Sequence, residues 1–372
     1  MYNIDYENLS GLNKPFAEVY EKQFSEMLAK GWFVLGEQVA SFEAEFAQYL
    51  GSNYFLGVAS GLDALEMPIK IREYPLCSEI IVPSNTYIAT INAILNTVHK
   101  PVFVEPDIHT YTIDADRIEE KITDRTKAIM VVHLYGKPCE MDKITAICKK
   151  YNLDLIEDCA QSHGAKYKGQ TTGTFGFGAF SFYPTKNLGA LGDAGGIAVN
   201  QEADYQKLRA WRNYGSNVKY HNEFIGDNSR LDEIQAGFLR IKLKALHEIT
   251  SHKRHLANLY HNLIDPKKFI LPSRDANLEE VHHIFPIRHH RRDELKQYLL
   301  EHGIRTEIHY PVSPINQKSI QNEFAKKSWK LDEKDFVLSC EIHSSILSLP
   351  VSTIHSEEDI RNIAECLNRF PN

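Results

Sequence analysis

The segment Ala179-Phe-Ser-Phe-Tyr-Pro-Thr-Lys186-Asn-Leu-Gly-Ala-Leu-Gly-Asp-Ala-Gly195 places one lysine among aromatic and small residues. Apolar runs predict two strands, at 179–182 and 196–199, that flank a Gly-rich turn carrying Lys186. The surrounding aromatic and aliphatic side chains would desolvate the ammonium and lower its pKa. Such a neutral amine is a nucleophile; the alternative is a surface lysine beside a strand.

Upstream of this stretch, short apolar strands alternate with helices, which predicts an α/β fold with a mostly parallel sheet covered by helices. Two helices precede the sheet, at 16–30 and 37–50, and each ends at a glycine, Gly31 or Gly51. We expect further strands at 54–58, 79–82, 102–104, 128–133 and 154–157. We expect further helices at 64–72, 89–98, 114–121, 140–151, 202–212 and 231–246.

The C-terminal third predicts a smaller α/β unit. A long helix at 249–264 would lead into strand, helix and strand segments at 283–288, 292–302 and 305–309. A last helix at 357–369 has Ser356 as its N-cap and acidic residues in its first turn. We therefore divide the chain into a large domain, 1–248, and a small C-terminal domain, 249–372.

Composition narrows the class of protein. The chain has 372 residues, a net charge of −7, 43% hydrophobic and 24% charged residues, as in ordinary globular proteins. No basic block indicates nucleic-acid binding, and no apolar run approaches the ~18 residues of a membrane span. The six cysteines have no CxxC or zinc-like spacing, so we expect no metal and a reducing compartment. The N-terminus does not resemble a signal peptide, and we expect a cytoplasmic protein.

Asp158 comes directly after an apolar strand, in Ile156-Glu-Asp158-Cys-Ala-Gln161-Ser-His163-Gly164. Open α/β sheets bind ligands beyond the carboxyl ends of their strands, and alternation turns the preceding Glu157 the other way. A carboxylate here, followed later by a desolvated lysine, suits pyridoxal phosphate (PLP). The carboxylate pairs with the protonated ring nitrogen, and the lysine forms the Schiff base. Taken alone, Asp158 could equally cap a helix.

Two other segments suit the remaining parts of this cofactor. Val58-Ala-Ser60-Gly61-Leu62-Asp63 predicts a strand, a turn and a helix start, where free N–H groups favour a phosphate. Ser181 adds a hydroxyl group five residues before the lysine. Tyr87 follows a strand and would stack on the pyridine ring. The alternative for residues 58–63 is an ordinary turn of an α/β fold, and the alternative for Tyr87 is a tyrosine of the core.

With these residues in view, the chain resembles the sugar-nucleotide aminotransferases of the DegT/DnrJ/EryC1/StrS group nearly end to end. The resemblance implies the fold-type I aspartate aminotransferase architecture. The motifs that carry it are Ser60-Gly-Leu-Asp-Ala-Leu65, Val82-Pro-Ser-Asn-Thr-Tyr87, Val132-His-Leu-Tyr-Gly136, Glu157-Asp-Cys-Ala-Gln-Ser-His-Gly164, Ser181-Phe-Tyr-Pro-Thr-Lys186 and Gly226-Asp-Asn-Ser-Arg-Leu-Asp-Glu-Ile-Gln-Ala236.

The resemblance implies a role for each motif. Lys186 would be the Schiff-base lysine and Asp158 the partner of the ring nitrogen. Gln161 would contact the ring hydroxyl group, and Tyr87 would stack on the ring. Family members are dimers with shared active sites, so Asn228 would reach the phosphate from the second subunit. The phosphate itself would be held by Gly61, Leu62 and Ser181.

Within the family, three segments resemble enzymes that act on dTDP-linked 3-keto-6-deoxyhexoses. They are Arg212-Asn-Tyr-Gly-Ser-Asn-Val-Lys219-Tyr220-His, Asn228-Ser-Arg-Leu-Asp232 and Glu307-Ile-His309-Tyr310-Pro311. By this similarity, Lys219 would pair with the nucleotide diphosphate across the dimer interface. The residues Tyr183, Tyr220, His309 and Tyr310 would line the substrate pocket.

The implied reaction is a two-step transamination with L-glutamate as amino donor and pyridoxamine phosphate as the intermediate form of the cofactor. The product would be a 3-amino-3,6-dideoxy sugar of galacto or gluco configuration, for a surface polysaccharide such as lipopolysaccharide or an S-layer glycan. A 4-keto-sugar or inosose aminotransferase and a non-catalytic regulator of the same fold are the alternatives. A deoxygenating dehydratase of this family would carry histidine in place of Lys186.

Overall fold

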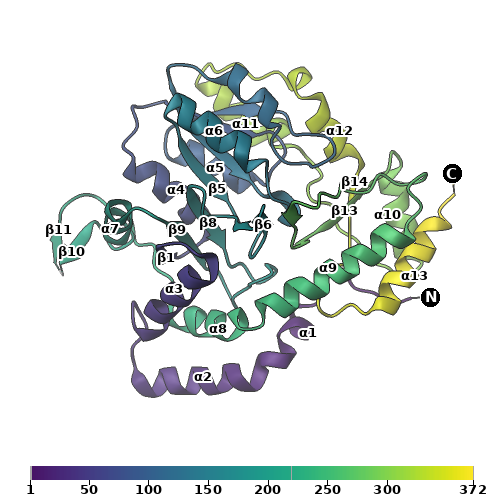
Figure 1. Cartoon of the computed structure of the whole chain (residues 1–372), viewed down its shortest axis with the longest axis horizontal. Coiled ribbons are helices and arrows are strands. Elements are labelled where there is room, and N and C mark those ends of the chain that lie inside the picture. Colours follow the sequence, from purple (N-terminus) through teal and green to yellow (C-terminus); the bar gives the residue numbers. More distant parts are fainter. Residues whose placement is uncertain (1, 219, 372) are drawn as a thin grey trace.

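A seven-stranded sheet forms the centre of the protein, as the computed structural model of residues 2–218 and 220–371 shows (Figure 1). The strand order is β1-β9-β8-β5-β4-β2-β3. The strands from β8 to β3 run parallel, whereas β9 is antiparallel to both β8 and β1. The mostly parallel, mixed sheet expected from the sequence is confirmed. Its strands are β1 (Tyr54–Val58), β2 (Glu79–Pro83), β3 (Lys100–Val104), β4 (Thr126–Val132), β5 (Asp154–Asp158), β8 (Phe177–Ser181) and β9 (Gly195–Val199).

Both faces of this sheet are buried because successive side chains of a strand point to opposite sides. Ile80 and Val82 pack with α4 (Gly61–Ile71) and α5 (Ile88–Asn96). The intervening Ile81 packs with α6 (Met141–Tyr151) on the other face. Near β1 and β8, two more helices cover an aromatic cluster, α3 (Glu37–Leu50) and α8 (Glu233–Leu243).

The remaining helices of the first two thirds lie around this core. They are α1 (Leu9–Asn13), α2 (Ala17–Lys30) and α7 (Glu202–Trp211), with the 3-10 turns η1 (Lys14–Phe16), η2 (Ala115–Arg117), η3 (Glu119–Lys121) and η4 (Leu134–Gly136). Small strands form a hairpin, β10 (Ser216–Val218) and β11 (His221–Asn222), and a three-stranded sheet of β6 (Lys166–Tyr167), β7 (Gln170–Thr171) and β12 (Leu278–Glu279). The hairpin projects from the body of the molecule beyond α7 (Figure 1).

The long helix α9 (Leu246–Leu263) leads from α8 to a second core (Figure 1). In that core, α9, α10 (Arg292–Glu301) and α13 (Glu357–Asn368) pack with the antiparallel pair β13 (Phe285–Arg288) and β14 (Ile346–Leu349). Ile4 joins this core from the N-terminus. The division after residue 248 falls within α9 and stays a prediction. The remaining C-terminal elements are η5 (Pro314–Asn316), α11 (Lys318–Lys326), η6 (Glu333–Asp335) and α12 (Val337–Ser345). Ile320 and Phe324 of α11 pack with the core of the large sheet.

Most expected elements are confirmed within a few residues. Gly31 and Gly51 have φ of 66° and 79°, the left-handed helix caps that glycine adopts without strain. Ser356 and Asp359 form a capping box at the start of α13. Among the described residues, no helix is both long and apolar enough to cross a membrane.

Two expectations were wrong. The helix expected at 114–121 is two single turns, η2 and η3, because Asp114 caps only the first and Ile122 is already extended. The strand expected at 305–309 is one bridge, in which Glu307 exchanges both backbone hydrogen bonds with Ser348. The strand that pairs with β13 is instead β14. We did not predict a strand from its apolar run, Ile346–Leu349.

Candidate active site

Asp158 and Lys186 come from the carboxyl ends of adjacent parallel strands. Asp158 is the last residue of β5 and lies opposite Ala179 of β8. The chain leaves β8 at Ser181 and turns sharply, with the N–H of Lys186 donating to the carbonyl of Tyr183 at 2.8 Å. This turn brings the lysine back over the edge of the sheet that Asp158 occupies, close enough for each charge to affect the pKa of the other.

Asp158 is buried, with 6% of the residue's surface exposed. Thr90 of α5 donates its hydroxyl hydrogen to Oδ2 at 2.8 Å, and the N–H of Ala160 donates to Oδ1 at 3.1 Å. Burial raises the pKa of Asp158, while these two hydrogen bonds and the charge of Lys186 lower it. The two hydrogen bonds therefore hold the carboxylate in one orientation. In that orientation it can accept a hydrogen bond from a protonated ring nitrogen of the cofactor.

The amine of Lys186 makes no hydrogen bond to any residue that the structure describes. Burial lowers its pKa to about 8, against the opposing charges of Asp158 and Glu7. An amine with this pKa is partly neutral near pH 7 and is free to react with a carbonyl carbon. The desolvation expected from the sequence is thus present around this lysine.

The start of α4 offers free backbone N–H groups. Ser60 caps the helix, accepting the N–H of Asp63 on its hydroxyl oxygen at 3.1 Å. No described residue accepts a hydrogen bond from the N–H of Gly61 or Leu62, so both donors remain available. Gly61 must be glycine because a Cβ there would lie 2.5 Å from the Cβ of Ser181. The helix start and Ser181 are therefore neighbours, as the PLP interpretation requires.

Tyr87 and Gln161 each contact Tyr310, which lies close enough to Asp158 for the two charges to interact. The ring of Tyr87 is 52% exposed and lies 5.1 Å from the ring of Tyr310, centroid to centroid. Gln161 is oriented by two hydrogen bonds, accepting from the N–H of Tyr135 at 2.6 Å and donating to Tyr310 Oη at 3.1 Å. Burial raises the pKa of Tyr310, so its hydroxyl group stays protonated.

The other predicted substrate residues are more scattered. His309 contacts Ser348 through Nδ1 at 2.9 Å, and burial lowers its pKa to about 4. Tyr183 is half exposed beside the lysine turn. Asn228 and Tyr220 are exposed near the projecting hairpin, and Lys219 lies outside the described residues. The chain thus brings together most of the predicted cofactor residues. Asn228 precedes Ser229, whose hydroxyl oxygen accepts the N–H of Ala59 at 3.2 Å, two residues before Gly61. Tyr220 instead lies between the two strands of the hairpin.

Several residues of the site were not assigned a role from the sequence. Thr90 lies one helical turn after Thr86, whose hydroxyl group is 2.8 Å away, so the i, i+4 spacing of these two threonines was the available signal. Tyr135 orients Gln161 through its backbone. Glu7 reaches the site on an N-terminal segment that pairs with residues 302–305, a contact that no local pattern indicates.

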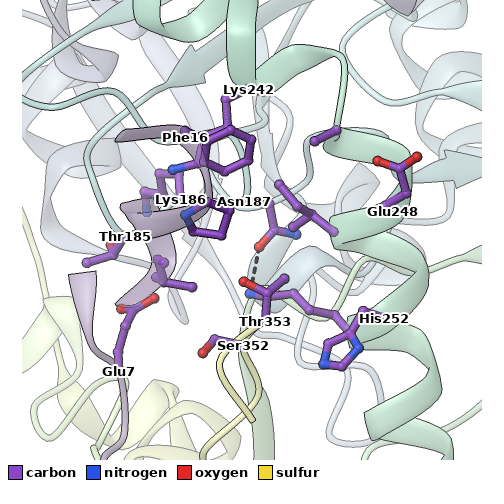
Figure 2. A pocket seen from close by; sticks show the side chains of 15 residues that line it. Glu7, Phe16, Thr185, Lys186, Asn187, Lys242, Glu248, His252, Ser352 and Thr353 are labelled. Atoms are coloured by element: carbon purple, nitrogen blue, oxygen red, sulfur yellow. Dashed lines mark hydrogen bonds between the residues drawn. The ribbon is translucent and has the colours of Figure 1, made fainter. Parts of the chain in front are cut away.

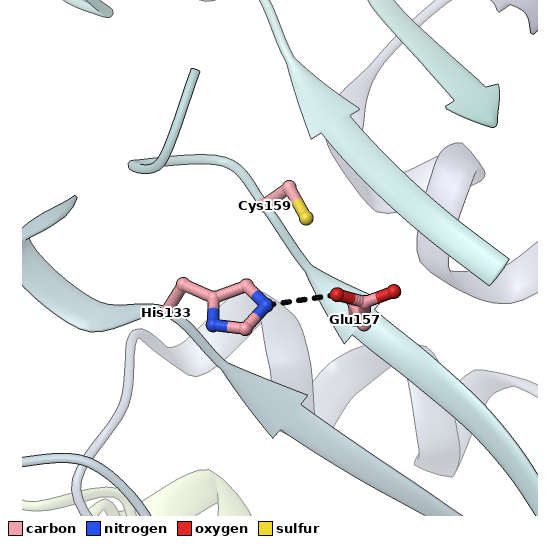
Figure 3. Close-up of side chains that lie close together, drawn as sticks. All are labelled: His133, Glu157 and Cys159. Carbon is pink, nitrogen blue, oxygen red and sulfur yellow. Dashed lines mark hydrogen bonds and ion pairs between the residues drawn. The ribbon is translucent and has the colours of Figure 1, made fainter. Parts of the chain in front are cut away.

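Glu157, His133 and Cys159 form a compact buried group (Figure 3). By strand alternation, Glu157 shares the face of β5 with Leu155, opposite the face that carries Ile156 and Asp158. Glu157 accepts hydrogen bonds from His133 Nε2 at 3.1 Å and from the N–H groups of Gly173, Phe175 and Gly176 at 2.8–2.9 Å. The other ring nitrogen of His133 accepts from Cys139 N–H at 3.1 Å. Because these bonds occupy the carboxylate and both ring nitrogens, we interpret the group as a brace for the loop that enters β8.

A buried carboxylate, a free amine of lowered pKa and an open helix start define the site of a PLP-dependent enzyme. The model of the DegT/DnrJ/EryC1/StrS aminotransferase family matches residues 17–368, and the chain belongs to this family.

Relatives and solved structures agree with this assignment. The dTDP-3-amino-3,6-dideoxy-alpha-D-galactopyranose transaminase of Aneurinibacillus thermoaerophilus is 46% identical over 368 residues, 99% of each chain. DesV of S. venezuelae, solved in complex with a ketimine intermediate, superposes with a TM-score of 0.95 and 34% identity. The superposition covers 100% of this chain and 99% of DesV. NtdA from Bacillus subtilis, with bound cofactor PMP, gives a TM-score of 0.89 and 30% identity, and the superposition covers 99% of this chain and 85% of NtdA. The cofactor of this protein is pyridoxal phosphate, and the fold expected from the resemblance is confirmed.

Proposed function

We propose that the protein transfers an amino group from L-glutamate to C3 of a dTDP-linked 3-keto-6-deoxyhexose. The observation that carries the proposal is the pair of Asp158 and Lys186 at the carboxyl ends of β5 and β8. Support for the substrate comes from the Aneurinibacillus relative, whose name specifies a dTDP-3-amino-3,6-dideoxyhexose. The product would enter a surface polysaccharide, and the reaction would take place in the cytoplasm.

In this reaction, the cofactor supplies an aldehyde that condenses with amines and a ring that withdraws electrons from the bound carbon. Asp158, oriented by Thr90 and Ala160, keeps the ring nitrogen protonated. Lys186 Nζ takes the proton from the α-carbon of the donor and returns it to the carbon that carries the cofactor's amine, as a general base and then as an acid. For the sugar, the same amine moves the proton in the reverse direction.

The remaining roles follow the resemblance. Gly61, Leu62 and Ser181 would bind the phosphate, Tyr87 would stack on the ring, and Gln161 would contact the ring hydroxyl group. We further propose a homodimer with shared active sites, to which Asn228 and the hairpin with Lys219 contribute from the partner. Tyr220 and Ile225 are 85% and 92% exposed in the single chain, which favours burial of this region against a second subunit.

Two measurements test the proposal. Purified protein loaded with PLP should aminate dTDP-3-keto-6-deoxyhexose with glutamate, and activity confined to the 4-keto isomer would contradict the substrate assignment. A Lys186→Gln variant should retain the fold, measured by circular dichroism, and lose turnover. Turnover of the keto sugar by this variant would contradict the role of Lys186.

A further inference from the structure

A second cavity meets the active site at Lys186. It has a volume of about 260 Å³ and lies between the N-terminal segment, the lysine turn and the α8–α9 junction (Figure 2). Of the described residues assigned above to the cofactor or the sugar nucleotide, only Lys186 lines it. The cavity is therefore a separate space that opens beside the reactive amine.

Two lysines, Lys242 of α8 and Lys253 of α9, line this cavity and are each only 4% exposed. Lys242 Nζ donates to Asn13 Oδ1 at 3.1 Å and to the carbonyl of Gly189 at 3.2 Å. Lys253 Nζ donates to Asn187 Oδ1 at 2.8 Å (dashed in Figure 2) and to the carbonyl of His283 at 3.4 Å. All four acceptors are neutral oxygens, and an ammonium group has three hydrogens. Each lysine thus keeps one donor for a ligand.

The charges around the cavity do not balance. No carboxylate of the described residues forms an ion pair with Lys242 or Lys253, although burying an unpaired cation is costly. Burial accordingly lowers the pKa of each lysine to about 8. Glu7 is the one partly buried carboxylate in the lining, while Glu248 is exposed at the rim. Besides the partly neutral amine of Lys186, two buried ammonium groups therefore face one inward carboxylate, and an anion in the cavity would offset the excess positive charge.

We propose that this cavity binds the side-chain carboxylate of the dicarboxylic amino donor, held by Lys242 and Lys253. The inference rests on the proposed transamination and adds the position of the donor. An amino acid whose amine reacts beside Lys186 has its side chain free to extend into the adjoining cavity. The nucleotide diphosphate fits less well, because none of His309, Tyr310 or Tyr183 lines this space.

The experiment uses the PLP-loaded protein and glutarate, a dicarboxylate that lacks the reactive amine. Calorimetry should detect glutarate binding, and Lys242→Met and Lys253→Met should each weaken it about tenfold or more, the effect of losing a hydrogen bond to a charged group. Lys244→Met is the matched control because Lys244 is exposed and absent from the lining. Glu7→Gln removes a repulsive charge and should tighten glutarate binding.

The rate of the donor half-reaction gives a second readout, followed by the cofactor absorbance. The ratio of the second-order rate constants for glutamate and alanine should fall about tenfold in each Lys→Met variant. A merely structural role would lower both rates together and leave that ratio unchanged. An unchanged ratio, or equal affinity of the wild-type protein for chloride, phosphate and glutarate, would overturn the inference. Failure of the wild-type protein to aminate any keto sugar would instead refute the proposed function.

Discussion

Replacing Thr90 by valine tests whether Asp158 acts through the ionised form that its hydrogen bonds stabilise. The substitution keeps the shape of the side chain and removes the 2.8 Å bond to Oδ2, leaving the Ala160 N–H at 3.1 Å. A hydrogen bond to a charged group contributes about 1.5–3 kcal/mol, and about 1.4 kcal/mol corresponds to one pKa unit. The pKa of Asp158, already raised by burial, should rise further by about one unit or more. The carboxyl group then competes with the ring nitrogen for the proton, and turnover should fall about tenfold or more.

The assay is single-turnover amination with glutamate, together with a pH titration of the cofactor absorbance. Thr97→Val is the matched control, because Thr97 directly follows α5 and its hydroxyl group donates to the carbonyl of Ala93 in that helix, at 2.8 Å, and not to Asp158. The control should leave the titration curve in place. An unshifted titration in Thr90→Val, with turnover within twofold of the wild-type value, would refute the reasoning.

Three further predictions follow from the same geometry. The rate at which PLP loads onto the apoprotein should rise with pH through about 8, because only the neutral Lys186 amine reacts, and a rate independent of pH between 6 and 9 would contradict the lowered pKa. Glu157→Gln should lower the free energy of unfolding by about 2–4 kcal/mol in a denaturant titration, since an amide nitrogen cannot accept hydrogen bonds from the backbone N–H groups that face the side chain. The exposed control, Glu279→Gln, should change the free energy of unfolding by less than about 0.5 kcal/mol. Asn228→Ala should weaken PLP retention during dialysis, and mixed dimers with Lys186→Gln chains should regain activity at the one site that has both residues; no recovery would contradict a shared site.

Much of this site could be predicted from the sequence, because the positions of its main residues follow from local patterns. A strand followed by Asp158, a small-residue turn after β1 and a Gly-rich turn around Lys186 each place a side chain at the carboxyl edge of the sheet. Strand alternation also put Glu157 on the opposite side, where it braces the loop before β8. These expectations depend only on the period of a strand and on where helices begin.

Other features depend on contacts between distant parts of the chain, which no local pattern encodes. Glu7 reaches the lysine only because the N-terminal segment pairs with Ile304. Lys242 and Lys253 look like ordinary helix-surface lysines in the sequence, and their burial arises from packing of α8 and α9 against the lysine turn. We predicted a strand at 305–309, where the structure has a single bridge between Glu307 and Ser348. The sequence of one segment does not show how many of its residues pair with another strand.

The most direct test of the account is to find which amine holds the cofactor, since the lysines Lys186, Lys242 and Lys253 line one cavity and all have a pKa lowered to about 8. The PLP-loaded protein would be reduced with borohydride, digested and analysed by mass spectrometry. The account predicts the phosphopyridoxyl group on Lys186 alone. Its attachment to Lys242 or Lys253, or to no lysine at all, would contradict the account.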